Sequence, residues 1–394
     1  MKAGGGRAWA RSTEQASLAQ QGHDIVAARR QFRQLDAATQ FALAREIALC
    51  RAAELTLAYR NLVMVAAGYK YKRRSDGGER RLPQPCVVLV VKAKWSATED
   101  QRHRDDQQRL PTELLAFATR ADGRRVLCAV PTDVRLDAHY SGAQAQTDRA
   151  VAVAGEAGTL TCAVELRQGS KRTRYLMSAQ HVLSPQPVLD PAALATGQAL
   201  LCVAGQQAVP PVLGRSANIG GRLRRAPALS LDVQLAEPEA PAKARLRQML
   251  SDLALSAQLP HVAQVDDFGA LMDGDLEVLV PDNNPNAAGA SRTAVLGRFD
   301  GFMPPAFSIE YGDPPLRIHH FELLRLKLRA GRTLPGDSGS PVVHWNDDGR
   351  ATLVGMHIAG APGLSYVLPA WQLFDLDAYW QAPAGASLRP VSLG

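Results

Sequence analysis

Cysteine is sparse in this sequence. The 394 residues contain five cysteines, an odd number, and none lies in a C-x-x-C or Cys/His ligand pattern. Single, scattered cysteines argue against a disulfide scaffold, and the missing ligand spacing argues against a structural zinc site. We therefore expect reduced thiols, no metal and no other cofactor. Cys86, Cys128 and Cys162 lie in apolar strand-like runs, which predicts that they are small core residues.

Long apolar segments are also missing. The N-terminus, MKAGGGRAWARSTEQ, is basic but contains no apolar stretch of signal-peptide length, and no uncharged apolar run is long enough to span a bilayer. Hydrophobic residues make up 46% of the chain and charged residues 21%, which is ordinary for a packed globular protein. We expect a soluble, cytoplasmic protein of two or three domains with no membrane partner.

The positive charge is confined to the front of the chain. Residues 1–150 contain 25 Lys and Arg against 16 Asp and Glu, a balance of +9, and the remaining residues contain 20 against 22, a balance of −2. The densest part, KYKRRSDGGERR (70–81), has a turn sequence at its middle and predicts an exposed hairpin. A solvated hairpin is the simplest interpretation. An acidic partner is the alternative, and protein is favoured over nucleic acid because only Tyr69 and Tyr71 could stack on bases.

The first 140 residues divide into two predicted parts. Residues 1–57 have the composition and apolar spacing of helices, with a break near His23 or Asp36. Residues 58–140 contain strand-like runs and predict a small α+β domain, for which a regulatory role is one interpretation, and in which LPTELLAFA (110–118) forms a short helix after Pro111. A polar stretch, 139–150, predicts a linker.

Residues 141–386 change to short apolar runs separated by Gly, Pro and Asn, which predicts a mainly β sandwich or barrel. One insertion, 241–258, opens with proline and continues with strong helix formers, so we expect a helix there between two β halves. Residues 282–292 predict an exposed loop, and residues 387–394 a tail.

Three segments of the β region carry candidate catalytic side chains. TLPGDSGSPVVHW (333–345) holds Ser338, and a serine hydroxyl needs a neighbouring base, itself oriented by an acid, to act as a nucleophile. YLMSAQHVLSP (175–185) delivers His181 to the end of a strand. LSLDVQLAE (229–237) places Asp232 inside an apolar strand, where an unpaired carboxylate is costly, and His181 is its natural partner.

The segments SAQHVL, LDVQL and GDSGSPVV, in this order, resemble the His, Asp and Ser boxes of the trypsin-like (chymotrypsin-fold) serine proteases. The resemblance covers residues 150 to about 375 and implies two six-stranded β-barrels with the catalytic site between them. It implies that His181 is the general base and acid, Asp232 the orienting carboxylate and Ser338 the nucleophile. More weakly, RNLVMVAAGYK, PCVVLVVKAKW, LPTELL and CAVPTDVRL resemble the N-terminal α+β module that precedes trypsin-like domains in some bacterial and plant intracellular proteases.

The serine segment also supplies expected oxyanion donors. Gly336 and Gly339 allow backbone conformations closed to other residues, and the resemblance implies that the N–H groups of Gly336 and Ser338 form the oxyanion hole. In secreted members of the family, the residue matching Asp337 pairs with an N-terminus freed by cleavage. No Ile-Val-Gly-Gly start is visible near residue 150, which predicts a single-chain enzyme whose serine segment is held in another way.

The flanks of the serine segment bear on substrate choice. Arg332 stands where enzymes selective for Lys and Arg have an acid, so a basic substrate side chain is disfavoured. Thr333 and His357 resemble the pocket residues of glutamyl endopeptidases and viral 3C-like proteases, which implies a preference for Glu or Gln before the scissile bond. The alternatives are that His357 only packs in the second barrel, and that cleavage follows Leu or small residues.

These observations predict a serine endopeptidase acting on protein substrates. The alternative is a catalytically silent adaptor that keeps the protease fold for binding and uses the basic N-terminal region for docking. The remaining histidines show no metal-ligand spacing and are expected to be surface or core residues: His23, His103, His139, His261, His319, His320 and His344.

Overall fold

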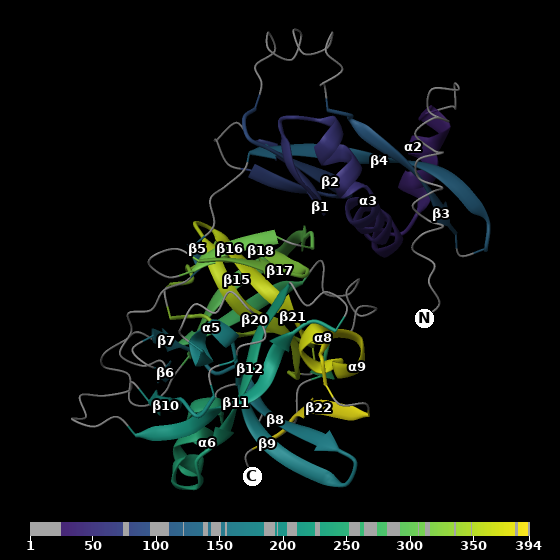
Figure 1. The fold of residues 1–394 in the computed structure, drawn as a ribbon. Helices are drawn as coiled ribbons and strands as arrows, with labels where there is room; N and C mark the ends of the chain where they lie inside the picture. The colour runs from purple at the N-terminus through teal and green to yellow at the C-terminus, as the bar shows by residue number, and fades with distance from the viewer. Residues whose placement is uncertain are drawn as a thin grey trace. The chain divides into compact units, whose positions relative to one another are not determined.

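We describe the chain from a computed structural model (Figure 1). The structure describes residues 25–73, 79–94, 110–120, 122–136, 141–142, 151–153, 156–184, 194, 196–202, 211–224, 229–251, 261–263, 274–281, 292–305, 307–311, 316–334, 336–347, 349–382 and 385–392. These residues fall into two compact units. Unit 1 comprises Met1–Ala138 and Asp300–Pro304, and unit 2 comprises His139–Phe299 and Pro305–Gly394.

Unit 1 is a small sheet with two helices. The helices are α2 (Ile25–Gln34) and α3 (Ala37–Ala58), and Asp36 separates them because its side chain caps α3, accepting from the Thr39 N–H at 2.8 Å. The strands are β1 (Leu62–Arg73), β2 (Glu79–Val91), β3 (Glu113–Thr119) and β4 (Arg125–Leu136). They pair in the order β1-β2-β4-β3, with β2 and β4 parallel and the other pairs antiparallel. Residues 301–302 extend this sheet beside β1.

The hairpin predicted over 70–81 is confirmed, because β1 and β2 pair as far as Arg73 opposite Glu79. Its tip, 74–78, lies outside the described residues. Lys72 and Arg80 are both exposed and directly opposite each other, an arrangement of like charges that costs some stability. The acidic partner for this basic region stays a prediction.

The helix predicted over 110–118 is wrong: Glu113–Thr119 is strand β3, paired antiparallel with β4. Its buried residues, Leu114 and Ala118, are four positions apart. A spacing of four places two side chains on one face of a helix and equally on one face of a strand, so the pattern did not separate the two. Pairing with the apolar strand β4 decides in favour of the strand.

Unit 2 is mainly β, as the sequence predicts. Six of its strands close into an antiparallel barrel through the pairings β14–β15, β15–β18, β18–β21, β21–β20, β20–β19 and β19–β14. The strands are β14 (Asp275–Pro281), β15 (Arg292–Met303), β18 (Leu323–Ala330), β19 (Pro341–Trp345), β20 (Ala351–Ala361) and β21 (Leu364–Pro369). Of the two six-stranded barrels that were predicted, this one is confirmed.

The other strands of unit 2 form a ribbon paired in the order β7-β6-β10-β11-β12-β9-β8-β22. Their bounds are β6 (Val151–Val153), β7 (Glu156–Gly158), β8 (Cys162–Gln168), β9 (Lys171–Ser178), β10 (Ala199–Cys202), β11 (Val212–Arg222), β12 (Ser230–Pro238) and β22 (Ala386–Pro390). Among the described residues the two ends of this ribbon are not paired with each other. Residues 387–390, expected in a tail, therefore lie in a strand that pairs with β8.

Short elements complete unit 2. The helices are α5 (Gln180–Leu183), η1 (Ala240–Ala242), α6 (Lys243–Ser251), α8 (Ala370–Phe374) and α9 (Leu376–Tyr379), and the remaining strands are β5 (Ser141–Gly142), β13 (His261–Val262), β16 (Phe307–Tyr311) and β17 (Leu316–His320). The helix predicted over 241–258 is found as far as Ser251, and its remainder lies outside the described residues, as do most of 139–150 and 282–292. No helix among the described residues is long and apolar enough to cross a membrane.

Three of the cysteines that lie in strands are core residues. Cys86, Cys128 and Cys162 lie in β2, β4 and β8 and are at most 1% exposed. All three, with the half-buried Cys50, are free thiols. Burial raises the pKa of Cys86 to about 12 and that of Cys128 to about 11, so both are poor nucleophiles.

Candidate active site

His181 is presented by the end of a strand, as the sequence predicts. Strand β9 stops at Ser178, and His181 is the second residue of the single-turn helix α5. The end of that helix is tied to β12, because the Ser184 hydroxyl donates to Oε1 of Gln234 at 2.6 Å. The His181 side chain is 13% exposed, so α5 holds an almost buried imidazole.

Asp232 lies inside β12 between two fully buried apolar residues and is itself 1% exposed. Its φ is +48°, in the left-handed region, and it is the one non-glycine residue with positive φ in the described part of the chain. Its N–H donates to the Ser230 hydroxyl at 2.8 Å. Aspartate tolerates this conformation better than most residues, and such backbone strain is often found at functional sites.

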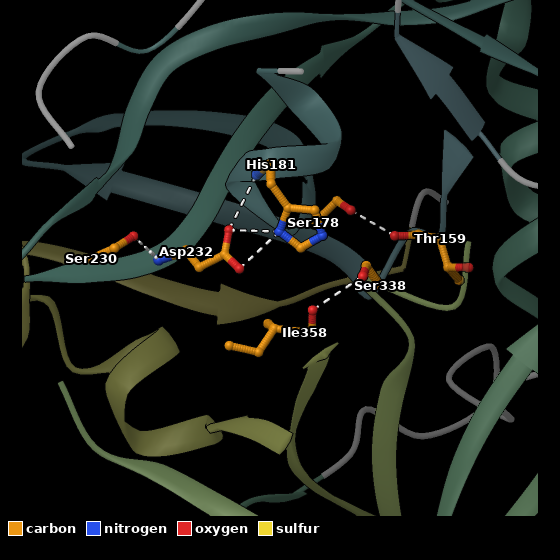
Figure 2. A network of polar contacts seen from close by, with 7 residues as sticks. All are labelled: Thr159, Ser178, His181, Ser230, Asp232, Ser338 and Ile358. Atoms are coloured by element: carbon orange, nitrogen blue, oxygen red, sulfur yellow. Dashed lines mark hydrogen bonds and ion pairs between the residues drawn. The ribbon is translucent and has the colours of Figure 1, made fainter. Parts of the chain in front are cut away.

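His181 and Asp232 are paired by three contacts. His181 Nδ1 lies 2.8 Å from Oδ2 and 3.0 Å from Oδ1 of Asp232, and the His181 main-chain N–H donates to Oδ1 at 3.1 Å (Figure 2). Burial alone would raise the pKa of Asp232, but the charge and hydrogen bonds of His181 lower it below its ordinary value. The carboxylate is therefore ionised and fixes the ring so that the Nδ1 proton faces the acid.

A second histidine lies beside Asp232. His320, at the end of β17, pairs with Ser230 of β12 and is fully buried. It is therefore a core residue, one of the two locations expected from the sequence. Burial lowers its pKa to about 4, and the charge of Asp232 opposes that shift. His320 is therefore neutral at ordinary pH.

Ser338 lies in a buried loop, residues 336–340, which we call the serine loop. Its hydroxyl is 0% exposed and donates to the carbonyl of Ile358 in β20 at 3.1 Å. In Figure 2 the His181 ring lies between Asp232 and Ser338, and its Nε2 edge faces the serine. The loop is pinned to β20, because the Gly339 N–H donates to the His357 carbonyl and the His357 N–H to the Ser340 carbonyl, both at 2.8 Å.

Two N–H groups of the serine loop donate to no other group among the described residues. Gly336 and Gly339 have φ values of +95° and +93°, which other residues rarely adopt. The N–H groups of Asp337, Gly339 and Ser340 donate to carbonyls, whereas those of Gly336 and Ser338 donate to no group in the described part of the chain. The two residues expected to form the oxyanion hole are thus the two with unused donors.

Asp337 is buried in the same loop. Its Oδ2 accepts from the Leu334 N–H at 2.6 Å, and among the described residues it forms no ion pair. Burial raises its pKa from 3.8 to about 7, and the bond from Leu334 only partly opposes this. The serine loop therefore contains a carboxyl group that takes up a proton near neutral pH.

The predicted pocket residues lie partly together. A Cβ placed on Gly360 would lie 2.6 Å from Thr333 Oγ1 and 3.8 Å from His357 Cε1, so a glycine keeps open the space beside both side chains. His357 is fully buried, and its Nδ1 lies 2.8 Å from the Ser365 hydroxyl. Burial and the nearby His181 lower the pKa of His357 to about 3. Arg332, by contrast, has an exposed side chain.

Comparison with known proteins gives little more. No family model matches the chain, and no curated protein matches its sequence. Among solved structures, two of the NS6 protease of murine norovirus match, one of them an inactive mutant with a C-terminal extension. Both are 14% identical to this chain. Each match covers 50% of this chain and 83% or 80% of the norovirus chain, with TM-scores of 0.26 and 0.25. At this level of likeness the function must be inferred from the geometry of the site itself.

Proposed function

We propose that the chain is a serine endopeptidase that hydrolyses peptide bonds of protein substrates through Ser338, His181 and Asp232. The observation that carries this proposal is the buried, ionised Asp232 held at 2.8 Å from Nδ1 of a histidine whose other edge faces a buried serine. A carboxylate in that position fixes the tautomer of the imidazole that can accept a proton at Nε2.

In the proposed reaction, His181 Nε2 takes the proton of the Ser338 hydroxyl while the serine oxygen bonds to the scissile carbonyl carbon. The carbonyl electrons move onto its oxygen, and the N–H groups of Gly336 and Ser338 stabilise the resulting negative charge. His181 then gives its proton to the leaving amine as the C–N bond breaks. Water, deprotonated by the same histidine, hydrolyses the acyl-serine, and Asp232 stays ionised throughout.

One rotation connects the described geometry with this reaction. The Ser338 hydroxyl donates to the Ile358 carbonyl at 3.1 Å. The proposed reaction requires this hydroxyl to leave the carbonyl and turn toward His181, a change that rotation about the Cα–Cβ bond between staggered positions can make.

Burst kinetics test the proposed function. With an activated ester, an enzyme that passes through an acyl-serine releases one equivalent of leaving group per active site before steady turnover. We expect such a burst from the full-length protein. Ester hydrolysis without a burst under conditions where deacylation limits the rate, or no hydrolysis at all, would contradict the proposal.

We further propose that His357 selects Gln, and less well Glu, before the scissile bond. When the Ser365 hydroxyl donates to Nδ1, the ring proton lies on Nε2, which can donate to a side-chain oxygen. Because its pKa is about 3, the ring stays neutral and cannot compensate the charge of a buried carboxylate. The neutral amide of Gln is therefore the better match, and Thr333 supplies a second hydroxyl beside the same space.

A panel of peptides that differ only in the residue before the scissile bond checks this preference. We expect kcat/KM for Gln to exceed that for Glu by about tenfold and that for Lys by about a hundredfold or more, since a polar pocket rejects an unmatched side chain strongly. His357→Leu should remove the preference, whereas His344→Leu, in the neighbouring strand β19, should keep it. Equal cleavage after Gln and Lys by the wild-type protein would contradict the assignment.

A further inference from the structure

Residues 158–161, which run from the last residue of β7 to the start of β8, contact the segment that carries His181. The Thr161 N–H donates to the Met177 carbonyl at 2.8 Å, and the Ser178 hydroxyl donates to the Thr159 carbonyl at 2.6 Å (Figure 2). Gly158 packs directly on α5, because a Cβ on it would lie 2.3 Å from Val182 Cγ2. This side of the segment is therefore fixed to the end of β9 and to the helix that holds the base.

The other side of the same segment is bonded to the serine loop. The Thr159 N–H donates to the Ser338 carbonyl at 2.7 Å, and the Thr159 hydroxyl to the Gly336 carbonyl at 3.0 Å. The Thr161 hydroxyl donates to the Gly339 carbonyl at 2.7 Å. Three successive bonds thus reach three carbonyls of a five-residue loop, and two of them come from side chains.

The contact is close and dry. Thr159 is 5% exposed and Thr161 is 0% exposed, so a loop carbonyl deprived of its hydroxyl donor would have no water to replace it. A Cβ on Gly339 would lie 1.8 Å from the Thr159 carbonyl oxygen, which means that only glycine allows the loop to approach this far. The two glycines of positive φ, Gly336 and Gly339, are also the two residues that the threonine hydroxyls hold.

We propose that Thr159 and Thr161 are positioning residues that hold the serine loop against the His181 segment and so keep the two oxyanion donors and the nucleophile assembled in a single uncleaved chain. This inference rests on the proposed function. Neither threonine touches the reacting atoms; both act through the carbonyls of Gly336 and Gly339. Among the described residues Asp337 forms no ion pair. The two threonines hold the loop in place of such a pair.

The test compares the full-length variants Thr159→Val, Thr161→Val and Thr159→Ser with Thr352→Val. Thr352, in β20, is a matched control because it is 4% exposed and its hydroxyl accepts from Asn346 rather than bonding to the serine loop. We expect Thr159→Val and Thr161→Val each to lower kcat by about 10- to 100-fold with KM within about twofold, as for a displaced oxyanion donor. Thr159→Ser, which keeps the hydroxyl, should recover most of kcat, and Thr352→Val should retain it.

Amide hydrogen exchange gives a second measurement that does not depend on catalysis. We expect the Gly339 and Ser340 amides to exchange at least about tenfold faster in Thr159→Val and Thr161→Val and at the wild-type rate in Thr352→Val. Unchanged kcat together with unchanged exchange in Thr159→Val and Thr161→Val would overturn the inference. If the wild-type protein gives neither a burst nor peptide hydrolysis, the proposed function fails, and the exchange rates alone then decide whether the threonines hold the loop.

Discussion

Replacing Ser338 with alanine is expected to lower kcat/KM for peptide hydrolysis by on the order of 10⁴-fold or more, the loss typical of removing the nucleophile from a catalytic triad. The variant keeps the proposed oxyanion donors and the His181–Asp232 pair, so the residual rate measures what they contribute alone. Among the described residues the Ser338 hydroxyl makes one hydrogen bond, to Ile358, so the change removes a single polar contact. Steady-state kinetics with a Gln-containing peptide measure the effect.

Ser340→Ala is the matched control for this variant. Ser340 lies two residues away in the same loop and is equally buried, but its hydroxyl has no hydrogen-bond partner in the described part of the chain. We expect its kcat/KM to stay within a few-fold of wild type. His181→Ala should lose about as much activity as Ser338→Ala, and the double variant no more than either, because the two residues act as a unit. Equal losses in the Ser338 and Ser340 variants would point to a structural defect of the loop.

Replacing Asp337 with asparagine is expected to stabilise the protein above neutral pH. The folded-state pKa of Asp337 is raised from 3.8 to about 7, so the folded protein binds this proton more tightly than the unfolded chain. Its contribution to stability is fully present below about pH 4 and is lost as the pH rises toward 7. Three pKa units correspond to about 4 kcal/mol, which is the largest gain expected from Asp337→Asn.

Urea unfolding of both proteins between pH 4 and pH 8 measures this gain as a difference in the free energy of unfolding. The difference should be near zero at pH 4, grow up to about pH 7 and then level off, because asparagine carries no charge yet can still accept from the Leu334 N–H. Other titrating groups, Asp232 among them, act on both proteins and cancel. A difference that is constant with pH, or largest at pH 4, would show that Asp337 is paired or ionised in the folded protein.

Part of the site could be predicted from short stretches of sequence. His181 follows an apolar strand, and Asp232 interrupts one, where its charge requires a partner; the structure brings the two within 2.8 Å. Gly336 and Gly339 flank the serine because the backbone there has positive φ. Each of these features depends on a few neighbouring residues and is therefore visible locally.

The rest depends on contacts between distant parts of the chain. The bond from Thr159 to Gly336 spans 177 residues, and nothing in the sequence around either threonine marks it as a contact of the serine loop. The hydroxyl of Ser230 bonds to the Asp232 N–H, and that of Ser365 to His357 Nδ1. Neither contact could be predicted from the local sequence. Arg332 was placed in the substrate pocket from its sequence distance to Ser338, but its side chain is exposed. Sequence distance alone therefore does not show that a side chain lines the pocket.

We propose that Ser338 is a nucleophile activated by His181. Labelling of the full-length protein with a fluorophosphonate, followed by peptide mass spectrometry, tests it most directly, because this probe reacts with activated serines and not with ordinary hydroxyls. We predict one adduct, on Ser338, that is absent from Ser338→Ala and strongly reduced in His181→Ala. A folded wild-type protein that remains unlabelled, or an adduct on another residue that persists in Ser338→Ala, would contradict the account.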